Sequence, residues 1–338
     1  MKYREHKSAS RKYKAEYLSQ LEGFIKKRQA ECSEKRKDYI KDLFSDQESY
    51  RNDFKNMLGW PLNDDEEMAK IPEVKLVELS REDGYTLYRM QIEILDGVWL
   101  TGLFFRMDGD DAKPLVFVQH GGWGTPEFMS GVYGSTANDN DMLQRIIKYN
   151  VHAFAPQLLL WNPSTYALGV DRVSIDARLK RVGSSITAVE VGGYRKAMNY
   201  FENQSYVKSF GMVGLSYGGF YTLFTTASDT RIKSAISCSF FNTRDAYPWT
   251  DWTWWRAAEH FDDAEVAALV YPRKLCIEFG HLDEMFEFEN TKRSFERLTE
   301  LCQNSGVGTD WVTLYDFDGI HEFCRDNGPI EKMLNDLK

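Results

Sequence analysis

Short apolar runs alternate with longer helical patterns over the last three quarters of the chain. Residues 86–95 alternate apolar and polar positions, and residues 99–105 continue this pattern after the Asp96–Gly97 turn, which predicts a β-hairpin. Six further apolar runs of strand length follow at 115–118, 151–155, 210–213, 235–240, 275–279 and 311–315. Helical patterns separate several of these runs, at 142–149, 175–201, 220–227 and 288–302. This strand–helix alternation predicts an α/β fold with a mostly parallel sheet and helices on both of its faces.

The first 84 residues have a different pattern. Residues 1–60 are rich in Lys, Arg and Glu, and they carry Tyr17, Leu21, Phe24 and Ile25 at helical spacing. This spacing predicts one or two amphipathic helices docked on the main body of the protein. We therefore expect a helical N-terminal extension over residues 1–84 and an α/β domain over residues 85–338.

Composition and charge exclude several classes of protein. The chain of 338 residues is 43% hydrophobic, so it can bury a large core without disulfides or a metal. The net charge of −9 argues against a nucleic-acid partner, because phosphate binding requires a basic surface. No run approaches 18 apolar residues and no signal peptide is recognisable, so we expect no membrane association. The five cysteines form no CxxC pair, which predicts reduced thiols and a cytoplasmic location. The sequence leaves the oligomeric state open, and a homo-oligomer is possible.

A glycine-rich turn carries the candidate nucleophile, Ser216. Residues 213–219 read V-G-L-S-Y-G-G and place the pattern G-x-S-x-G between a predicted strand and a predicted helix. A serine in this context is held in a sharp turn at the helix N-terminus, where the helix dipole favours developing negative charge. The alternative is an ordinary glycine-rich turn without chemistry. The strand–turn–helix context favours the nucleophile.

A second glycine-rich turn follows the predicted strand at 115–118. Residues 119–124 read Q-H-G-G-W-G, and glycines after a strand let backbone N–H groups point into a site. Acyl transfer requires such donors to stabilise the oxyanion of its tetrahedral intermediate. We predict one donor from Gly122 or Trp123 and a second from Tyr217, the residue after the nucleophile. The alternative is a tight turn that binds nothing, and His120 is expected to be structural.

His321 and Asp283 are the predicted base and acid. Of the six histidines, His321 alone lies both after the acid candidate and on a late loop. Asp283 follows the strand at 275–279, which gives the chain order Ser, acid, His that is typical of this arrangement. Glu284 is the main rival of Asp283, while Glu278 lies within the strand and should point elsewhere. No His or Cys cluster has the spacing of metal ligands, so we expect no metal and no cofactor.

From about residue 85 onward, the chain resembles the α/β-hydrolase superfamily. The H-G-G turn, the G-L-S-Y-G-G elbow, G-H-L-D and the late G-I-H resemble dienelactone-hydrolase and acetyl-xylan-esterase-like bacterial esterases. This resemblance implies an eight-stranded, mostly parallel sheet, a covalent acyl-enzyme and no cofactor. Dienelactone hydrolases proper use a cysteine nucleophile. The serine at position 216 therefore favours an esterase.

An aromatic segment lies in the region where this fold places its cap, at about residues 242–272. Four of the nine tryptophans fall within residues 249–255. Aromatic faces suit sugar rings or apolar acyl groups, so we predict that Trp252 and Trp254 bind substrate at one wall of the active-site cleft. The alternative is a small lid packed on itself.

Three functions are consistent with these residues. The first is a serine carboxylic-ester hydrolase acting on a small or carbohydrate-linked ester. The second is a serine peptidase of the prolyl-oligopeptidase type, whose elbow is similar. That type carries a β-propeller before the catalytic domain, and about 85 residues are too few to form one. The third is a non-catalytic hydrolase fold that serves as a binding protein, which typically lacks a member of the triad. The first function is favoured.

Overall fold

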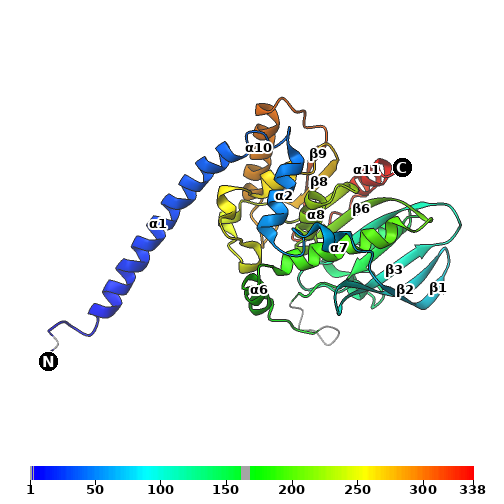
Figure 1. Ribbon diagram of the computed structural model, residues 1–338, viewed down its shortest axis with the longest axis horizontal. Helices are drawn as coiled ribbons and strands as arrows, with labels where there is room; N and C mark the ends of the chain where they lie inside the picture. Colours follow the sequence, from blue (N-terminus) through cyan, green and yellow to red (C-terminus); the bar gives the residue numbers. More distant parts are fainter. Residues whose placement is uncertain (1, 3, 161–167) are drawn as a thin grey trace.

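The computed structural model describes residue 2 and residues 4–160 and 168–338, and it is built around one mixed β-sheet (Figure 1). Nine strands form this sheet in the order β1-β2-β3-β5-β4-β6-β7-β8-β9. Strands β1 to β3 pair antiparallel with one another, β3 also pairs antiparallel with β5, and the remaining pairs are parallel. The strands are β1 (Val74–Glu82), β2 (Tyr85–Leu95), β3 (Val98–Met107), β4 (Lys113–Gln119), β5 (His152–Pro156), β6 (Val207–Leu215), β7 (Ile232–Cys238), β8 (Lys274–Gly280) and β9 (Val312–Phe317).

The predicted hairpin and all six later strands are present. Strand β2 pairs with β3 across the Asp96–Gly97 turn, as expected. The sheet has nine strands rather than eight because Val74–Glu82 forms an additional edge strand inside the segment that was expected to be helical. Most of the side chains of this strand are exposed, so it lacks the alternation of buried and polar positions that reveals a strand in a sequence.

Helices cover both faces of the sheet, and each face has its own apolar core. One core includes side chains from α2, α7, α8, α9 and α10, and the other includes side chains from α4, α5 and α11. The helices are α1 (Ala9–Tyr39), α2 (Gln47–Leu58), α3 (Asp65–Ala69), α4 (Pro126–Met129), α5 (Met142–Ile147), α6 (Arg172–Lys180), α7 (Ile186–Glu202), α8 (Tyr217–Ser228), α9 (Asp263–Ala268), α10 (Phe288–Asn304) and α11 (Gly328–Asp336). The parallel strands all end at the same edge of the sheet, which is where ligands bind in open α/β folds.

The long helical pattern at 175–201 is divided into α6 and α7. Gly183 has φ +79°, a conformation that ends α6, and the Ser185 side chain then accepts a hydrogen bond from the N–H of Ala188 to cap α7. The break lets α6 leave the sheet. As a result, α6 packs beside the segment that follows β7.

The two N-terminal helices behave differently. Helix α2 docks on the main body with Phe54 and Leu58 buried, as expected. Helix α1 extends away from the main body (Figure 1), and Tyr17 and Phe24 on it are 68% and 58% exposed. Only its C-terminal part contacts the main body, for example through Lys35. The expected docking on the main body is therefore present for α2 and for the C-terminal part of α1, and not for the rest of α1. No helix among the described residues is long and apolar enough to span a membrane.

Candidate active site

Ser216 occupies a sharp turn between β6 and α8. Its backbone has φ 60° and ψ −119°, and its N–H donates a hydrogen bond to the carbonyl of Cys238 (2.8 Å). Glycines on either side make the turn possible, because a Cβ on Gly218 would lie 2.1 Å from the carbonyl oxygen of Gln119 and one on Gly214 would lie 2.4 Å from Gly218. The strained backbone is typical of a nucleophile elbow, which presents the serine hydroxyl at the end of a helix.

His321 and Asp283 form a buried pair. The His321 Nδ1 lies 2.8 Å from Oδ2 of Asp283, whose side chain is fully buried. The other carboxylate oxygen of Asp283 accepts hydrogen bonds from the N–H groups of Met285 and Phe286, each at 2.9 Å. These two bonds fix the carboxylate. An ionised carboxylate can only accept a hydrogen bond, so this contact favours the tautomer of His321 that carries the proton on Nδ1 and leaves Nε2 as the acceptor.

Glu284, the rival acid, has another contact. Its Oε2 accepts a hydrogen bond from the backbone N–H of His321 (3.3 Å) and does not reach the imidazole ring. The expected contact between Asp283 and the ring is therefore the one that is present. Glu284 instead supports the loop that carries His321.

Ser216 and His321 line the same cleft, together with the glycine-rich turn after β4. A base and the nucleophile it activates meet at a hydrogen-bond distance of about 3 Å, and no hydrogen bond joins the Ser216 hydroxyl to the His321 ring among the described residues. Contacts of this kind are often long in free enzymes and tighten when substrate binds. The structure thus brings the two side chains to one cleft without joining them.

The turn after β4 lies directly against Ser216. A Cβ on Gly121 would lie 3.3 Å from the Cβ of Ser216, and Gly122, Trp123 and Tyr217, the predicted oxyanion donors, line the cleft. Their roles as donors remain proposals. The geometry places all three within the cleft that contains the serine.

His120 holds this turn in place. It is fully buried, which lowers its pKa to about 4 and keeps the ring neutral. Its Nδ1 lies 2.8 Å from the carbonyl oxygen of Gly121, while its Nε2 lies 3.4 Å from the N–H of Leu158. Because the C=O and N–H of one trans peptide point in opposite directions, the bond to Gly121 also fixes the direction of the Gly122 N–H. His120 is therefore structural, as expected.

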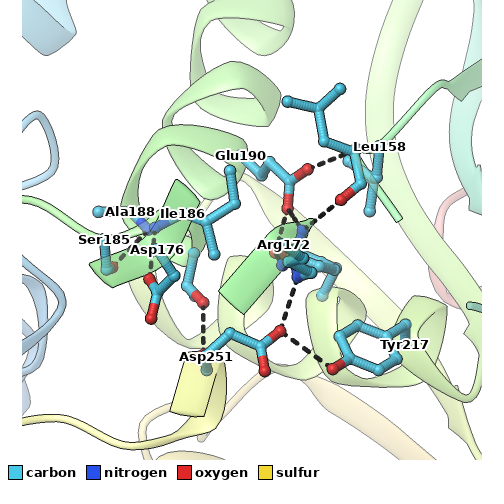
Figure 2. A network of polar contacts seen from close by, with 12 residues as sticks. Leu158, Arg172, Asp176, Ser185, Ile186, Ala188, Glu190, Tyr217 and Asp251 are labelled. Carbon is cyan, nitrogen blue, oxygen red and sulfur yellow. Dashed lines mark hydrogen bonds and ion pairs between the residues drawn. The ribbon is translucent and has the colours of Figure 1, made fainter. Parts of the chain in front are cut away.

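A buried polar network around Arg172 includes Tyr217, the residue that directly follows Ser216 (Figure 2). Arg172, only 3% exposed, donates from Nε to Oδ2 of Asp251 (2.6 Å) and from Nη1 to Oε2 of Glu190 (3.0 Å). The Tyr217 hydroxyl donates to the same Asp251 oxygen (3.0 Å), and Tyr221 joins Arg172 to Glu190. Burial alone would lower the pKa of Arg172, but the carboxylates of Glu190 and Asp251 raise it well above its ordinary value. The members of this network are far apart in the chain, so no local sequence pattern indicates it.

The cleft has a volume of about 420 Å³. Its lining combines aromatic side chains with polar groups, and the described lining contains carboxyl groups but no Lys or Arg. Besides Ser216, His321 and the glycine-rich turn, its lining includes Phe128, Ser135, Thr136, Asn138, Asp139, Trp249 and Glu284. A cleft of this size and character suits a small, uncharged or partly polar molecule.

Trp252 and Trp254 do not line the cleft, which corrects their assignment as substrate contacts. They are 3% and 8% exposed, and Trp252 packs against the ring of Tyr217 with centroids 5.0 Å apart. The 3₁₀ helix η3 (Thr250–Trp252) turns Trp252 toward the core, while Trp249, three residues earlier, lines the cleft. The aromatic segment is therefore mostly a packed lid with one residue at the cleft.

No protein-family model matches the chain, and no curated protein matches it in sequence. Among the described residues, no group of three or more His, Cys, Asp or Glu side chains is arranged to hold a metal ion.

Solved structures do resemble the chain. A glucuronoyl esterase from Solibacter usitatus has a TM-score of 0.62 at 13% identity, covering 87% of this chain and 92% of its own. A candidate acetyl xylan esterase from Bacteroides fragilis NCTC 9343 has a TM-score of 0.63 at 16% identity, covering 80% of this chain and 74% of its own. Acetyl Xylan Esterase 1 from Thermoanaerobacterium sp. JW/SL YS485 has a TM-score of 0.55 at 13% identity, covering 85% and 98%. At these identities the likeness shows the architecture, and the chain has the α/β-hydrolase fold.

Proposed function

We propose that the protein is a serine carboxylic-ester hydrolase that acts through a covalent acyl-enzyme. The observation that carries this proposal is the combination, in one cleft, of Ser216 on a strained elbow and His321 bonded to a buried Asp283. Each group has the role that acyl transfer requires: a nucleophile, a base and an acid that orients the base.

The reaction would proceed in two halves. His321 Nε2 takes the proton of the Ser216 hydroxyl as Oγ attacks the carbonyl carbon of the ester. The backbone N–H groups of Gly122 or Trp123 and of Tyr217 would stabilise the oxyanion. His321 then gives the proton to the departing alcohol, which leaves the acyl group on Ser216. In the second half, water takes the place of the alcohol. His321 accepts a proton from the water as its oxygen attacks the acyl carbon. The bond between that carbon and Oγ of Ser216 then breaks, and His321 returns the proton to Oγ as the acid leaves.

The substrate we propose is a small or carbohydrate-linked ester. Aromatic side chains such as Trp123 and Trp249 can face a sugar ring or an acyl group, and the described lining offers no cation for an anionic substrate. Proteins of the same fold include acetyl xylan and glucuronoyl esterases, which fits this class.

Active-site labelling together with hydrolysis tests the proposal. Wild-type protein should hydrolyse 4-nitrophenyl acetate and should gain one phosphonate adduct from a fluorophosphonate probe, located on Ser216 by peptide mass spectrometry. Ser216→Ala should lose labelling and activity, the latter on the order of 10⁴-fold or more, with an unchanged circular dichroism spectrum. An Ala variant with near-full activity, or an adduct on another residue, would contradict the assignment.

We also propose a cytoplasmic location, since all five cysteines are unpaired. Cell fractionation with an antibody to the native protein would test it, and recovery from an extracellular or periplasmic fraction would contradict it.

A further inference from the structure

Asp139 places a buried carboxyl group in the catalytic cleft. It ends the 3₁₀ helix η1 (Ala137–Asp139), is 6% exposed, and lines the cleft that contains Ser216 and His321. Its Oδ1 is buried and has no hydrogen-bond partner among the described residues. Leaving such a group unsatisfied is unfavourable, and few buried polar groups in folded proteins lack a hydrogen-bond partner.

The rest of the loop is well satisfied. The carbonyl of Asn138 accepts a hydrogen bond from the N–H of Phe323 (2.9 Å), and its side chain donates to the carbonyl of His321 (3.0 Å). The Asn140 side chain donates to Glu322 and to the carbonyl of Phe323, each at 2.7 Å. These bonds attach the loop to the one that carries His321, so the Asp139 carboxyl has a fixed position relative to the base.

The loop also stores backbone strain. Ala137, Asn140 and Asp141 all have positive φ angles, between 46° and 55°. Strained non-glycine residues cluster at binding and catalytic sites, where the surrounding structure holds them for a functional reason. Here the strain, the bracing bonds and the unsatisfied carboxyl coincide in five residues of one loop.

We propose that Asp139 binds a hydroxyl group of the substrate and so selects polyhydroxylated esters, such as partly acetylated sugars, over esters without hydroxyl groups. This inference rests on the proposed ester hydrolase. Oδ1 has almost no exposed surface, so a substrate hydroxyl would reach the carboxyl through Oδ2, which has no hydrogen-bond partner among the described residues either. The aromatic rings of Trp123, Phe128 and Trp249 in the same cleft suit a sugar ring.

A hydroxyl group fits the site better than an ammonium group. Burial raises the pKa of Asp139 to about 7, so that the carboxyl is only partly ionised near neutral pH, and an ammonium group would pair with the ionised form alone. A hydroxyl group can donate to the ionised form and can also accept from the protonated one. It therefore pairs with Asp139 in both forms.

Two variants and two matched substrates test the inference. Asp139→Leu removes the polar group at similar size, and Asp139→Asn keeps a hydrogen-bonding group. The substrates are a mono-acetylated methyl xyloside and tetrahydropyranyl acetate, which has the ring without the hydroxyls, with 4-nitrophenyl acetate as the reference. We expect Asp139→Leu to lower kcat/KM for the xyloside by roughly 10- to 100-fold and to change kcat/KM for the other two esters by less than about 3-fold. Asp139→Asn should retain a larger fraction of the wild-type kcat/KM for the xyloside than Asp139→Leu does.

Thermal unfolding separates binding from structural support. Because the carboxyl has no partner on Oδ1, removing it should leave the midpoint of unfolding unchanged or raise it, as happens when a functional group is removed from a strained site. A residue that supports the fold would lower the midpoint.

The outcomes that overturn the inference are distinct. An equal fall in kcat/KM for all three esters would make Asp139 a positioning residue for His321. Three outcomes would refute hydroxyl binding and leave the proposed hydrolase intact. The first is a preference for the xyloside that is unaltered in Asp139→Leu, and the second is a wild-type protein that does not hydrolyse the xyloside. The third is a wild-type preference for acetylcholine that Asp139→Asn abolishes. A wild-type protein inactive on every ester, 4-nitrophenyl acetate included, would refute the hydrolase itself, and this inference with it.

Discussion

The hydroxyl of Tyr217 donates a hydrogen bond to Oδ2 of Asp251, at 3.0 Å, inside the protein. Tyr217 directly follows the proposed nucleophile, and Asp251 belongs to the segment that covers this end of the sheet. The bond therefore connects the elbow to the lid. Arg172 completes the connection, because it bonds the same Asp251 oxygen and also Glu190 on α7.

Replacing Arg172 with Met should destabilise the protein by about 3–5 kcal/mol, because the carboxylates of Glu190 and Asp251 would remain buried without a cation. Urea denaturation monitored by tryptophan fluorescence measures this loss. Arg178→Met on the exposed face of the same helix is the matched control, and it should change the free energy of unfolding by less than about 0.5 kcal/mol. Equal effects of the two variants would show that the network contributes no stability.

Asp283 and Glu284 should differ sharply when each is converted to its amide. Asp283→Asn should lower kcat by on the order of 10⁴-fold, because the amide no longer holds the proton on Nδ1 of His321. Glu284→Gln should cost less than about 10-fold, since its contact is with the backbone N–H of His321 and an amide oxygen still accepts that bond. Steady-state hydrolysis of 4-nitrophenyl acetate compares the two. A larger loss in Glu284→Gln would reverse the assignment of the acid.

The buried carboxyl of Glu278 should make stability depend on pH. Burial raises the pKa of Glu278 from 4.5 to about 8, so the folded protein retains a proton that the unfolded chain releases above pH 4.5. Stability from this group is complete below pH 4.5 and is lost as the pH rises toward 8, with a slope of roughly 1 kcal/mol per pH unit.

Glu278→Gln tests this dependence, since the amide does not titrate. The difference in free energy of unfolding, variant minus wild type, should increase between pH 5 and pH 8 and level off above that range. Urea denaturation at pH 5, 6, 7, 8 and 9 gives the curve. A difference that does not vary with pH would mean that Glu278 is ionised in the folded protein throughout.

Local contacts explain which parts of the site were predictable. The elbow around Ser216 requires glycines at 214 and 218, because a Cβ at 214 would meet Gly218 and one at 218 would meet Gln119 at the end of the adjacent strand β4. This requirement leaves a short local pattern, G-x-S-x-G, that can be recognised in the sequence. The order of Ser216, Asp283 and His321 follows from the order in which parallel strands reach one edge of the sheet.

Other features depend on contacts that no local pattern records. Arg172 meets Asp251 across 79 positions, and a buried arginine near a helix start looks the same in the sequence as an exposed one. The Asp139 carboxyl is distinctive only because it has no partner, which a sequence cannot show. Strand β1 carries no inward-facing apolar row, and the apolar residues of α1 remain exposed although their spacing predicts a docked helix.

The tryptophans of the lid are close together in the sequence but have different surroundings in the structure. Trp249 lines the cleft and stacks on Tyr217, with ring centroids 5.9 Å apart. Trp252 is buried between Tyr217 and Phe220, and Trp255 is 90% exposed. Substitutions at these three positions therefore distinguish the effect of a contact with the cleft from the effect of core packing, with an exposed position as the control.

Trp252→Ala should lower the free energy of unfolding by about 3–5 kcal/mol, as expected when a large side chain is removed from a core. Trp249→Ala should mainly lower kcat/KM for acetylated sugars, with a smaller loss of stability, because only part of its surface packs against the lid. Trp255→Ala, the control, should leave stability within about 0.5 kcal/mol of the wild type and kinetics unchanged. Urea denaturation and steady-state kinetics on the same preparations give both quantities. If Trp249→Ala loses as much stability as Trp252→Ala and its folded fraction keeps wild-type kinetics, Trp249 is part of the lid and the wall of the cleft must be formed by other residues.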